Sequence, residues 1–479
     1  MNTNSVVFFG NSLSVMIGAL ELANKGIKVV ILNNSTNWGG HFSTINLNDT
    51  DYDRGMFLYE FTSFNSSDKE SDILTYDPWK RNDSGRFCNL IYKYVSKYIN
   101  THKIDAPKMY LNGIIFDDLL ISNNLNCLKN IYFYENAEKE LEIICSSKER
   151  HSLHAINKTT SDLFKAKSYE EVSLINHGPT IHQELIEPYC KKLINCSSKD
   201  IIALYHRVPW LPLYYPETLL SNFKNKPQQL SSTEFSNPIG HCAGDFAKYL
   251  LAKIKNNENI YLDSKNNLLK IDVSDLGEYH LKLDNGKSLF TTQLAWGAEN
   301  SALLKALGLS EKNQTYEKCS IALLFLKVPA DRIIQKFTVL NVIDANMATY
   351  RITNQTQCTG INASNVNLVS EINIDYAESI IGCPANEQEL VKLMLNELSK
   401  LGVITTIENH EQVILKQLKN TLMIPNKKNR EKFLIENEAI LNIVPNIHLL
   451  GPSSGFFSSS FNDQVVQGIK LATVLESLA

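Results

Sequence analysis

The sequence predicts an α/β fold that combines a parallel-sheet domain with a second, α+β domain. Short apolar runs at 6–9 and 29–32 flank a stretch with helical spacing of apolar residues, a pattern typical of a βαβ unit. Gly10 closes the first run, which is the turn signal expected at the end of the first strand. With 479 residues, 43% of them hydrophobic, the chain is long enough for two or three domains.

The N-terminal βαβ unit begins with an apolar strand, Val6 to Phe9, that ends at Gly10. Apolar residues then recur at mainly helical spacing until Gly26, which ends the helix. Val29 to Leu32 is a second strand of the buried type. Such a unit places the helix N-terminus beside the end of its first strand, where α/β proteins bind phosphate groups.

The turn after the first strand matches a dinucleotide-binding fingerprint in part. The fingerprint has glycine at three positions, which are occupied here by Gly10, Ser12 and Val15. Gly10 keeps the turn, and Ser12 is small enough for the helix N-terminus, with Leu13 and Ser14, to offer amides to a phosphate. Val15 is expected to push helix and strand apart unless another residue makes room.

Two further positions bear on this segment. Gly18, one turn after Val15, is expected to provide that room. Asn33 replaces the acid that usually holds a ribose hydroxyl, and its amide oxygen can accept the same hydrogen bond without a charge. Taken alone, the segment is either a cofactor site or an ordinary βαβ unit.

Residues 37–61 carry a second glycine motif, NWGGHFSTINLNDTDYDRGMFLYEF. The pair Gly39 and Gly40 precedes a polar hairpin and then Asp53 and Gly55. This arrangement resembles the superfamily of flavin-dependent amine oxidases, protoporphyrinogen oxidases and UDP-galactopyranose mutases, in which both segments lie over the flavin. Paired glycines let the backbone approach a cofactor where a Cβ atom would collide. The alternative is two solvent-exposed turns.

The resemblance implies FAD as the cofactor and a Rossmann-type domain that binds it. The implied contacts come from the first turn, the glycine pair with its neighbours, and the closing turn and helix. His41 stands where arginine is common in the superfamily. The residues implied to bind FAD are Gly10, Ser12, Leu13, Ser14, Asn33, Gly39, Gly40, His41, Phe42, Gly451, Asn462 and Asp463.

Later segments extend the resemblance over most of the chain. Residues 237–254 are similar to a Pro-x-Gly-Gly segment that leads into a helix, with the second glycine displaced to Gly244. The strand pattern at 259–272 is similar to the one that meets the adenine side of the cofactor. A hairpin follows, and its Asn285-Gly286 pair predicts a type I′ turn.

The last block, 446–478, is similar to the closing strand, glycine turn and helix of these flavoproteins. Gly451 keeps the turn, whereas Pro452 replaces the acid or arginine that commonly follows. Asn462, Asp463 and Gly468 match the start of a helix whose N-terminus points toward the flavin in the superfamily.

The resemblance predicts a discontinuous, two-domain organisation. The FAD-binding domain comprises 1–75, 225–310 and 425–479, and the substrate-binding domain comprises 76–224 and 311–424. Helical periodicity at 86–99 and 181–194, and strand-like runs at 320–328 and 366–374, make the second domain α+β.

Candidate substrate-side residues are Tyr350, Arg351 and Asn354, in the predicted strand 347–354. Strict alternation places Tyr350 and Asn354 on one face and Arg351 on the other. Mutases of the superfamily grip their substrate's diphosphate with an arginine in a similar setting, although a solvent-exposed arginine is an equal alternative. Glu371 faces either a cavity or solvent.

Two loops add candidates for which a plain structural role is the alternative. Residues 205–217 gather aromatics with His206 and Arg207, as a pocket lid or a small aromatic core. Residues 77–87 carry cations that can hold an anion or be solvated: Lys80, Arg81 and Arg86.

The composition excludes several classes of protein. A net charge of -4 gives no broad basic field, so we expect no nucleic-acid partner. No apolar run is long enough to span a membrane and no leader is evident, which predicts a cytoplasmic protein. Nine cysteines without a C-x-x-C pair fit a reducing compartment and predict no metal site. The expected partner is a small-molecule substrate, and the oligomeric state is not predicted.

The sequence thus predicts an FAD-dependent oxidoreductase of the amine oxidase or protoporphyrinogen oxidase-like class that acts on a small polar metabolite. One alternative is a UDP-galactopyranose mutase-like flavoenzyme that acts on a nucleotide sugar, which Pro452 disfavours because the mutases have arginine there. The other is a non-catalytic protein that keeps the fold without flavin.

Overall fold

A computed structural model describes most of the chain. The described residues are 5–33, 35–61, 70–81, 83–117, 132–147, 167–224, 226, 234–309, 315–405 and 412–477.

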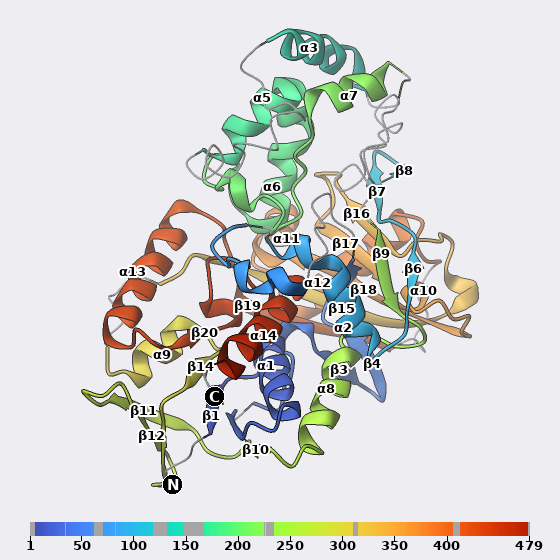
Figure 1. Cartoon of the computed structure of the whole chain (residues 1–479). Helices are drawn as coiled ribbons and strands as arrows, with labels where there is room; N and C mark the ends of the chain where they lie inside the picture. Colours follow the sequence, from blue (N-terminus) through green and yellow to red (C-terminus); the bar gives the residue numbers. More distant parts are fainter. Residues whose placement is uncertain are drawn as a thin grey trace.

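A five-stranded parallel sheet joins segments that are far apart in the sequence (Figure 1). Its order is β10-β2-β1-β14-β20, and every neighbouring pair is parallel. The strands are β1 (Val6–Phe9), β2 (Val29–Leu32), β10 (Ile260–Asp263), β14 (Leu294–Trp296) and β20 (His448–Leu449). Because the strands are parallel, their carboxyl ends lie along one edge of the sheet.

Helices α1 (Leu13–Asn24) and α14 (Phe461–Glu476) pack against each other on this sheet (Figure 1). The helices approach closely at Gly468, where a Cβ atom would lie 2.7 Å from the Ile17 Cβ. Helix α14 therefore needs a glycine at the crossing.

Val15 is accommodated by Gly297, which follows β14. A Cβ atom at Gly297 would lie 2.2 Å from a Val15 methyl. Gly18 instead lies against Phe8 and Gly468. The room that was expected from Gly18 thus comes from the glycine that follows β14.

A three-stranded antiparallel sheet shares a hydrophobic cluster with the parallel sheet. It consists of β11 (Leu268–Val273), β12 (Tyr279–Leu283) and β13 (Ser288–Thr291). The hairpin predicted between the last two strands is confirmed, but the type I′ turn is wrong. Gly286 has a φ of 79°, whereas Asn285 has no positive φ, and Leu283 pairs with Lys287 across the resulting longer loop.

A seven-stranded mixed sheet forms the centre of the second domain, in the order β19-β15-β18-β17-β16-β7-β8. Only β16 and β7 pair in parallel. Helices α11 (Ile374–Ile381) and α12 (Glu387–Lys400) cover one face. On the other face, Leu323 and Phe325 pack against Tyr52. The strands are β7 (Lys108–Leu111), β8 (Ile114–Asp117), β15 (Lys318–Pro329), β16 (Val339–Val342), β17 (Thr349–Asn354), β18 (Asn365–Asn373) and β19 (Gln412–Met423).

A helical part stands above this sheet in Figure 1. It contains α3 (Tyr134–Ser146), α5 (Tyr169–Ile181), a π-helical turn at His182–Ile186, α6 (Glu187–Ile194) and α7 (Pro216–Phe223). Helix α5 is kinked where Gly178, with a φ of 83°, precedes Pro179. Met109 and Tyr350 of the sheet belong to the hydrophobic cluster of these helices.

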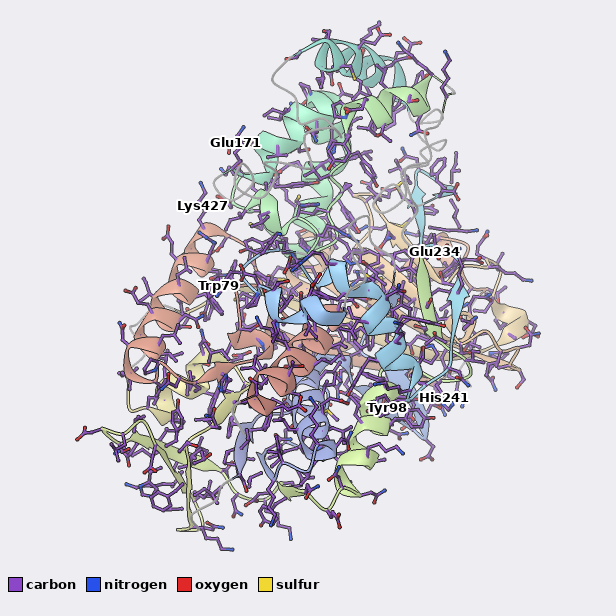
Figure 2. The ribbon with its side chains drawn as sticks, in the orientation of Figure 1. Trp79, Tyr98, Glu171, Glu234, His241 and Lys427 are labelled. Carbon is purple, nitrogen blue, oxygen red and sulfur yellow. The ribbon has the colours of Figure 1, made fainter. Side chains whose placement is uncertain are left out.

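The remaining elements connect these layers. The strands are β3 (Thr44–Leu47), β4 (Thr50–Asp53), β5 (Tyr59–Glu60), β6 (Thr101–Ile104) and β9 (Phe235–Pro238). The helices are α2 (Cys88–Ser96), α8 (Asp245–Lys255), α9 (Asn300–Ala306), α10 (Gln355–Cys358) and α13 (Lys427–Ile443). Trp79, which is labelled in Figure 2, packs against Phe433 of α13, and the two ring centroids lie 5.9 Å apart.

The predicted fold class is confirmed: a Rossmann-like α/β domain carries an inserted α+β domain. Among the described residues, no helix is long and apolar enough to cross a membrane. The described part of the chain also holds no group of three or more His, Cys, Asp and Glu side chains that can bind a metal. Its cysteines are free thiols, and Cys127 lies outside it.

Candidate dinucleotide-binding site

Three glycine turns meet at the carboxyl edge of the parallel sheet, and we call them the glycine turns: 10–14, 39–42 and 451–454. The first follows β1 and lies against the end of β14, because a Cβ atom at Gly10 would be 2.9 Å from the Gly297 carbonyl carbon. Gly10 has a φ of 118°, which favours glycine. This edge is where open α/β sheets bind ligands.

Ser12 is the N-cap of α1, and its hydroxyl accepts a hydrogen bond from the Val15 amide at 3.4 Å. The Ser14 amide donates to the Gln464 side-chain oxygen of α14 at 3.4 Å. Both serine hydroxyls are also bonded to each other, at 2.9 Å. Two amides of the first helical turn are thus satisfied within the protein, whereas the Leu13 amide has no partner among the described residues.

The second turn is tied to the first by two hydrogen bonds. The Gly39 amide donates to the Asn11 carbonyl at 2.8 Å, and the Asn11 side chain donates to the Asn37 carbonyl at 2.6 Å. Gly39 is needed for packing, since a Cβ atom there would lie 2.6 Å from the Ala247 Cβ. At Gly40, which has a φ of 60°, a Cβ atom would meet nothing within 4 Å. The open side of this turn is therefore at Gly40.

His41 follows Gly40 in the short 3-10 helix of the second turn. Its side chain is accessible to solvent, yet desolvation by the surrounding protein lowers its pKa to about 4. Its ring contacts Phe42, which also lies near Phe57 and Phe461, at centroid distances of 5.0 and 5.8 Å. An apolar aromatic group thus flanks the turn.

Asn33 follows β2 at the same edge, but its side chain is engaged locally. Its Nδ2 donates to the Ser35 carbonyl at 3.0 Å, and its Oδ1 accepts from the Ser35 amide at 3.0 Å. The Asn33 amide donates to the carbonyl of Asp263, the last residue of β10. A contact with a ribose requires the bonds to Ser35 to open or to be shared.

The third turn packs onto the first. Gly451 has a φ of 54°, and a Cβ atom there would lie 3.2 Å from the Ser12 Cβ. The Gly451 amide donates to Gln467 Oε1 at 2.7 Å, and Gln467 Nε2 donates to the Ser454 hydroxyl and the Ser458 carbonyl. Gln467 of α14 therefore fixes the conformation of this turn.

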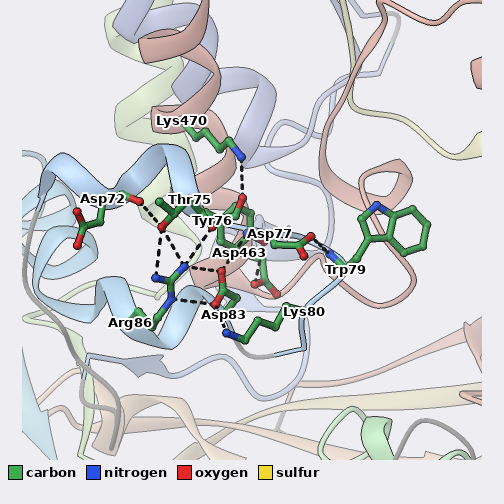
Figure 3. A network of polar contacts seen from close by, with 10 residues as sticks. All are labelled: Asp72, Thr75, Tyr76, Asp77, Trp79, Lys80, Asp83, Arg86, Asp463 and Lys470. Carbon is green, nitrogen blue, oxygen red and sulfur yellow. Dashed lines mark hydrogen bonds and ion pairs between the residues drawn. The ribbon is translucent and has the colours of Figure 1, made fainter. Parts of the chain in front are cut away.

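The start of α14 is closed by its own side chains. The Asp463 carboxylate accepts hydrogen bonds from the Ser460 amide and hydroxyl, which completes a capping box, and from the Tyr76 hydroxyl at 3.1 Å (Figure 3). The Asn462 side chain donates to the Glu60 carbonyl at 2.8 Å. Both predicted residues thus hold α14 against neighbouring loops.

On the side of the second domain, Tyr350 and Arg351 converge on Glu371. Arg351 donates through Nε at 2.8 Å and Nη2 at 2.7 Å, and the Tyr350 hydroxyl donates at 3.2 Å. Glu371 also accepts from the Met56 amide at 3.0 Å. The nearby Glu371 carboxylate raises the pKa of Arg351 against the opposing effect of burial. This network fixes the segment around Gly55.

The expected strict alternation along β17 is wrong. A bulge between Thr349 and Arg351 interrupts the pairing with β18 and brings Tyr350 to the same carboxylate as Arg351. Tyr350 and Ile352, which alternation places on one face, consequently lie in different hydrophobic clusters.

Asn354 is buried and caps α10, since its Oδ1 accepts from the Gln357 amide at 2.9 Å. It is not brought to the glycine turns. The next residue, Gln355, donates to the Asp53 carbonyl and accepts from the Asp53 amide, at 3.0 and 3.1 Å. Asp53 in turn accepts from the Ala243 and Gly244 amides at the start of α8.

The cations of the 77–87 loop have different surroundings. Arg86 and Lys80 both pair with Asp83, at 2.8 and 3.5 Å (Figure 3). Arg81 donates to the Phe457 carbonyl at 3.1 Å, and its buried Nε has no partner among the described residues. The 205–217 loop forms an aromatic core, in which Tyr205 packs against Phe456 at 5.0 Å.

Several residues of the site were not predicted from the sequence. Gln464 and Gln467 belong to a helix that the resemblance covers, but nothing in the pattern distinguishes a glutamine that bonds to a distant turn. Gly297 follows a predicted strand end, which is the signal that would have found it. Arg54 stands within the predicted Asp-x-Gly segment and donates to Ser43 and Asn37.

The fold and its three glycine turns define an α/β architecture of the dinucleotide-binding kind. No family model matches the sequence, and no curated protein matches it. Solved structures match it over the full chain. A reduced UDP-galactopyranose mutase has a TM-score of 0.70 at 12% identity and covers 100% of this chain and 96% of that one.

Two other solved structures show the same similarity. A protein from Exiguobacterium sp. 255-15 assigned as a protoporphyrinogen oxidase has a TM-score of 0.64 at 13% identity, covering 100% of this chain and 99% of that one. Putrescine oxidase bound to putrescine has a TM-score of 0.56 at 8% identity, with 100% of both chains covered. The resemblance to this superfamily is therefore confirmed at the level of the fold.

The residues of the glycine turns fit the diphosphate of a dinucleotide at one place. The Leu13, Gly40 and His41 amides have no partner among the described residues, and the space beside Gly40 is open. Unpaired amides at a helix N-terminus and a glycine turn are the donors that bind phosphate. The Ser14 and Val15 amides and the Asn33 side chain are less available to a ligand, because each already has a hydrogen-bond partner within the protein.

Proposed function

We propose that the chain binds FAD at the glycine turns and is an FAD-dependent oxidoreductase that acts on a small polar metabolite. The observation that carries this proposal is the bond between Gly39 and Asn11, which joins two turns whose unpaired amides lie at the carboxyl edge of the parallel sheet. The full-length match to solved oxidoreductases and a mutase supports it through the fold.

In this proposal each part of the chain has a defined task. Bound FAD supplies hydride or electron transfer. The Leu13, Gly40 and His41 amides bind its diphosphate, and the aromatic group of Phe42, Phe57 and Phe461 excludes water from the adjoining space. Glu371, through Met56, holds the segment around Gly55 against the seven-stranded sheet.

We extend the proposal to the organisation of the chain. Residues 1–75, 225–310 and 425–479 form the FAD-binding domain, and 76–224 and 311–424 form the substrate-binding domain. The substrate lies between these parts, and the protein acts in the cytoplasm.

The oxidoreductase proposal is tested by anaerobic mixing of the FAD-loaded protein with panels of small amines, amino acids and hydroxy acids. We expect at least one class to bleach the visible flavin absorption, and oxygen or a dye to restore it. Bleaching by dithionite alone, with no response to any panel member, would contradict this reaction type.

A nucleotide-sugar mutase is the second candidate, and Arg81 is the observation that favours it. Its buried Nε is unpaired among the described residues, which suits an anionic substrate. Thermal protection by uridine diphosphate tests this candidate. The non-catalytic alternative is favoured by the internal bonds of the Ser14 amide and Asn33, and it is tested by whether FAD binds at all.

A further inference from the structure

Arg54 is a half-buried cation without an opposite charge. Its Nε donates to the Ser43 hydroxyl at 3.2 Å, and its Nη2 donates to Asn37 Oδ1 at 3.1 Å. It forms no ion pair with any residue that the structure describes. Desolvation lowers its pKa, and no carboxylate among the described residues opposes this effect.

Three other arginines in the described part of the chain form ion pairs. Arg86 pairs with Asp83, Arg207 with Glu60 and Arg351 with Glu371. Arg81 has no direct pair, but the Asp463 charge acts on it. Because partial burial of an unpaired charge is unfavourable, an anion bound beside Arg54 would be stabilised.

The position of Arg54 indicates where this anion would bind. Its two partners, Asn37 and Ser43, both donate to the Gly40 carbonyl, at 3.2 and 2.7 Å. The Asn37 carbonyl accepts from Asn11 in the turn that leads to α1. The guanidinium is thus connected through one residue to each of the two turns whose amides are unpaired, and its Nη1 has no partner among the described residues.

We infer that Arg54 supplies the positive charge that binds the diphosphate of the dinucleotide at the glycine turns. This inference rests on the proposed function and names a residue that the sequence motif does not, since the motif favours His41. The His41 ring is neutral at pH 7 because desolvation lowers its pKa to about 4. Arg54 retains its charge at any physiological pH.

The test is an equilibrium titration of the full chain, freed of bound nucleotide by gel filtration in potassium bromide. Wild type, Arg54→Gln and Arg54→Lys are each titrated with FAD, ADP and riboflavin. Arg430→Gln is the matched control, because Arg430 lies on α13 and also forms no ion pair within the described residues.

We expect Arg54→Gln to weaken FAD and ADP binding about tenfold or more, as the loss of charged hydrogen bonds implies, and to leave riboflavin unaffected. Arg54→Lys should recover part of the loss, and Arg430→Gln should match wild type. Salt should weaken FAD binding less in Arg54→Gln than in wild type.

Two results would overturn the inference while the proposed function stands: unchanged FAD affinity in Arg54→Gln, or an equal loss for riboflavin, which marks a purely structural role. If Arg54→Gln fails to fold, Arg54→Lys decides, because a folded lysine variant with wild-type salt dependence supports a charge role and one without salt dependence refutes it. Failure of wild type to bind both FAD and ADP refutes the proposed function itself.

Discussion

Arg351 and Glu371 form a two-point ion pair across β17 and β18, with Nε to Oε1 and Nη2 to Oε2 distances of 2.8 and 2.7 Å. Their side chains are only 16% and 4% exposed. The same carboxylate accepts from the Met56 amide, so the pair joins the seven-stranded sheet to the segment that resembles a flavin-covering loop.

Glu371→Gln is expected to lower the free energy of unfolding by about 3 to 5 kcal/mol, because it leaves the Arg351 charge buried and uncompensated. Urea denaturation followed by circular dichroism measures this. The double variant Arg351→Met/Glu371→Gln should be more stable than Glu371→Gln alone. A single variant within about 0.5 kcal/mol of wild type would show that the pair does not hold the segment.

Gly39 and Gly40 are expected to respond differently to alanine. Gly39→Ala places a Cβ atom 2.6 Å from the Ala247 Cβ at a φ of 93°, and the overpacking alone should destabilise the fold by about 1 to 3 kcal/mol. Ala247→Gly should restore part of this loss.

The new Cβ atom in Gly40→Ala meets no neighbouring atom. The variant should therefore lose only about 1 to 2 kcal/mol of unfolding free energy, from the strain of a left-handed backbone. If FAD lies against the open side of this turn, the variant should fold and bind FAD weakly. The measurement is FAD affinity beside melting temperature for both variants. Wild-type affinity in folded Gly40→Ala would place the cofactor elsewhere.

The helical part contains a hydrogen-bond chain that requires neutral histidines. The Tyr214 amide donates to His177 Nε2 at 2.9 Å, so the neutral His177 ring carries its proton on Nδ1 and donates to the Ser173 hydroxyl at 3.0 Å. The Ser173 hydroxyl then donates to His182 Nδ1 at 2.9 Å. Protonation of either ring breaks this order.

We therefore expect acid to weaken the fold. Desolvation lowers the pKa of His177 to about 3 and also lowers that of His182. Because these folded-state values lie below the ordinary value of about 6.5, the unfolded chain binds protons first as the pH falls. The stabilisation is present above pH 6.5 and is lost progressively toward pH 3.

Urea denaturation across this pH range measures the slope, to which each such histidine contributes at most about 1.4 kcal/mol per pH unit. His177→Gln should reduce the slope by the contribution of about one proton, which is at most about 1.4 kcal/mol per pH unit. Ser173→Ala breaks the chain but keeps both rings, so it should lower stability while the slope persists. An unchanged slope in His177→Gln would contradict this account.

Uridine diphosphate is expected not to stabilise the protein. The Arg351 charge is compensated by Glu371, and Asp83 compensates both Lys80 and Arg86. Binding at about 100 times Kd would add about 2.7 kcal/mol, which a thermal shift detects easily. Clear stabilisation that disappears in Arg81→Gln or Arg351→Ala would make the nucleotide-sugar mutase the leading candidate.

Local sequence patterns predicted the elements that depend on local interactions. The βαβ unit lies at Val6–Phe9, Leu13–Asn24 and Val29–Leu32, as the apolar spacing and Gly10 indicated. The β12–β13 hairpin also follows from its turn residues. The resemblance predicted that strands distant in sequence would complete the parallel sheet, and this is confirmed by the fold.

Contacts between distant residues escaped prediction. Val15 is accommodated by Gly297, and the Ser14 amide is satisfied by Gln464, and neither pair leaves a pattern in one sequence. The bulge that brings Tyr350 beside Arg351 interrupts the alternation on which the strand prediction relied. Site roles for the predicted residues stay predictions until ligand binding is measured.

The central claim is that the glycine turns bind FAD, and the visible absorption spectrum of the purified full-length protein tests it most directly. The account predicts a yellow protein whose heat-released chromophore is FAD at about one equivalent per chain, or a colourless protein that becomes yellow on addition of FAD. A colourless protein that takes up no added FAD would contradict the claim and leave the fold without its cofactor.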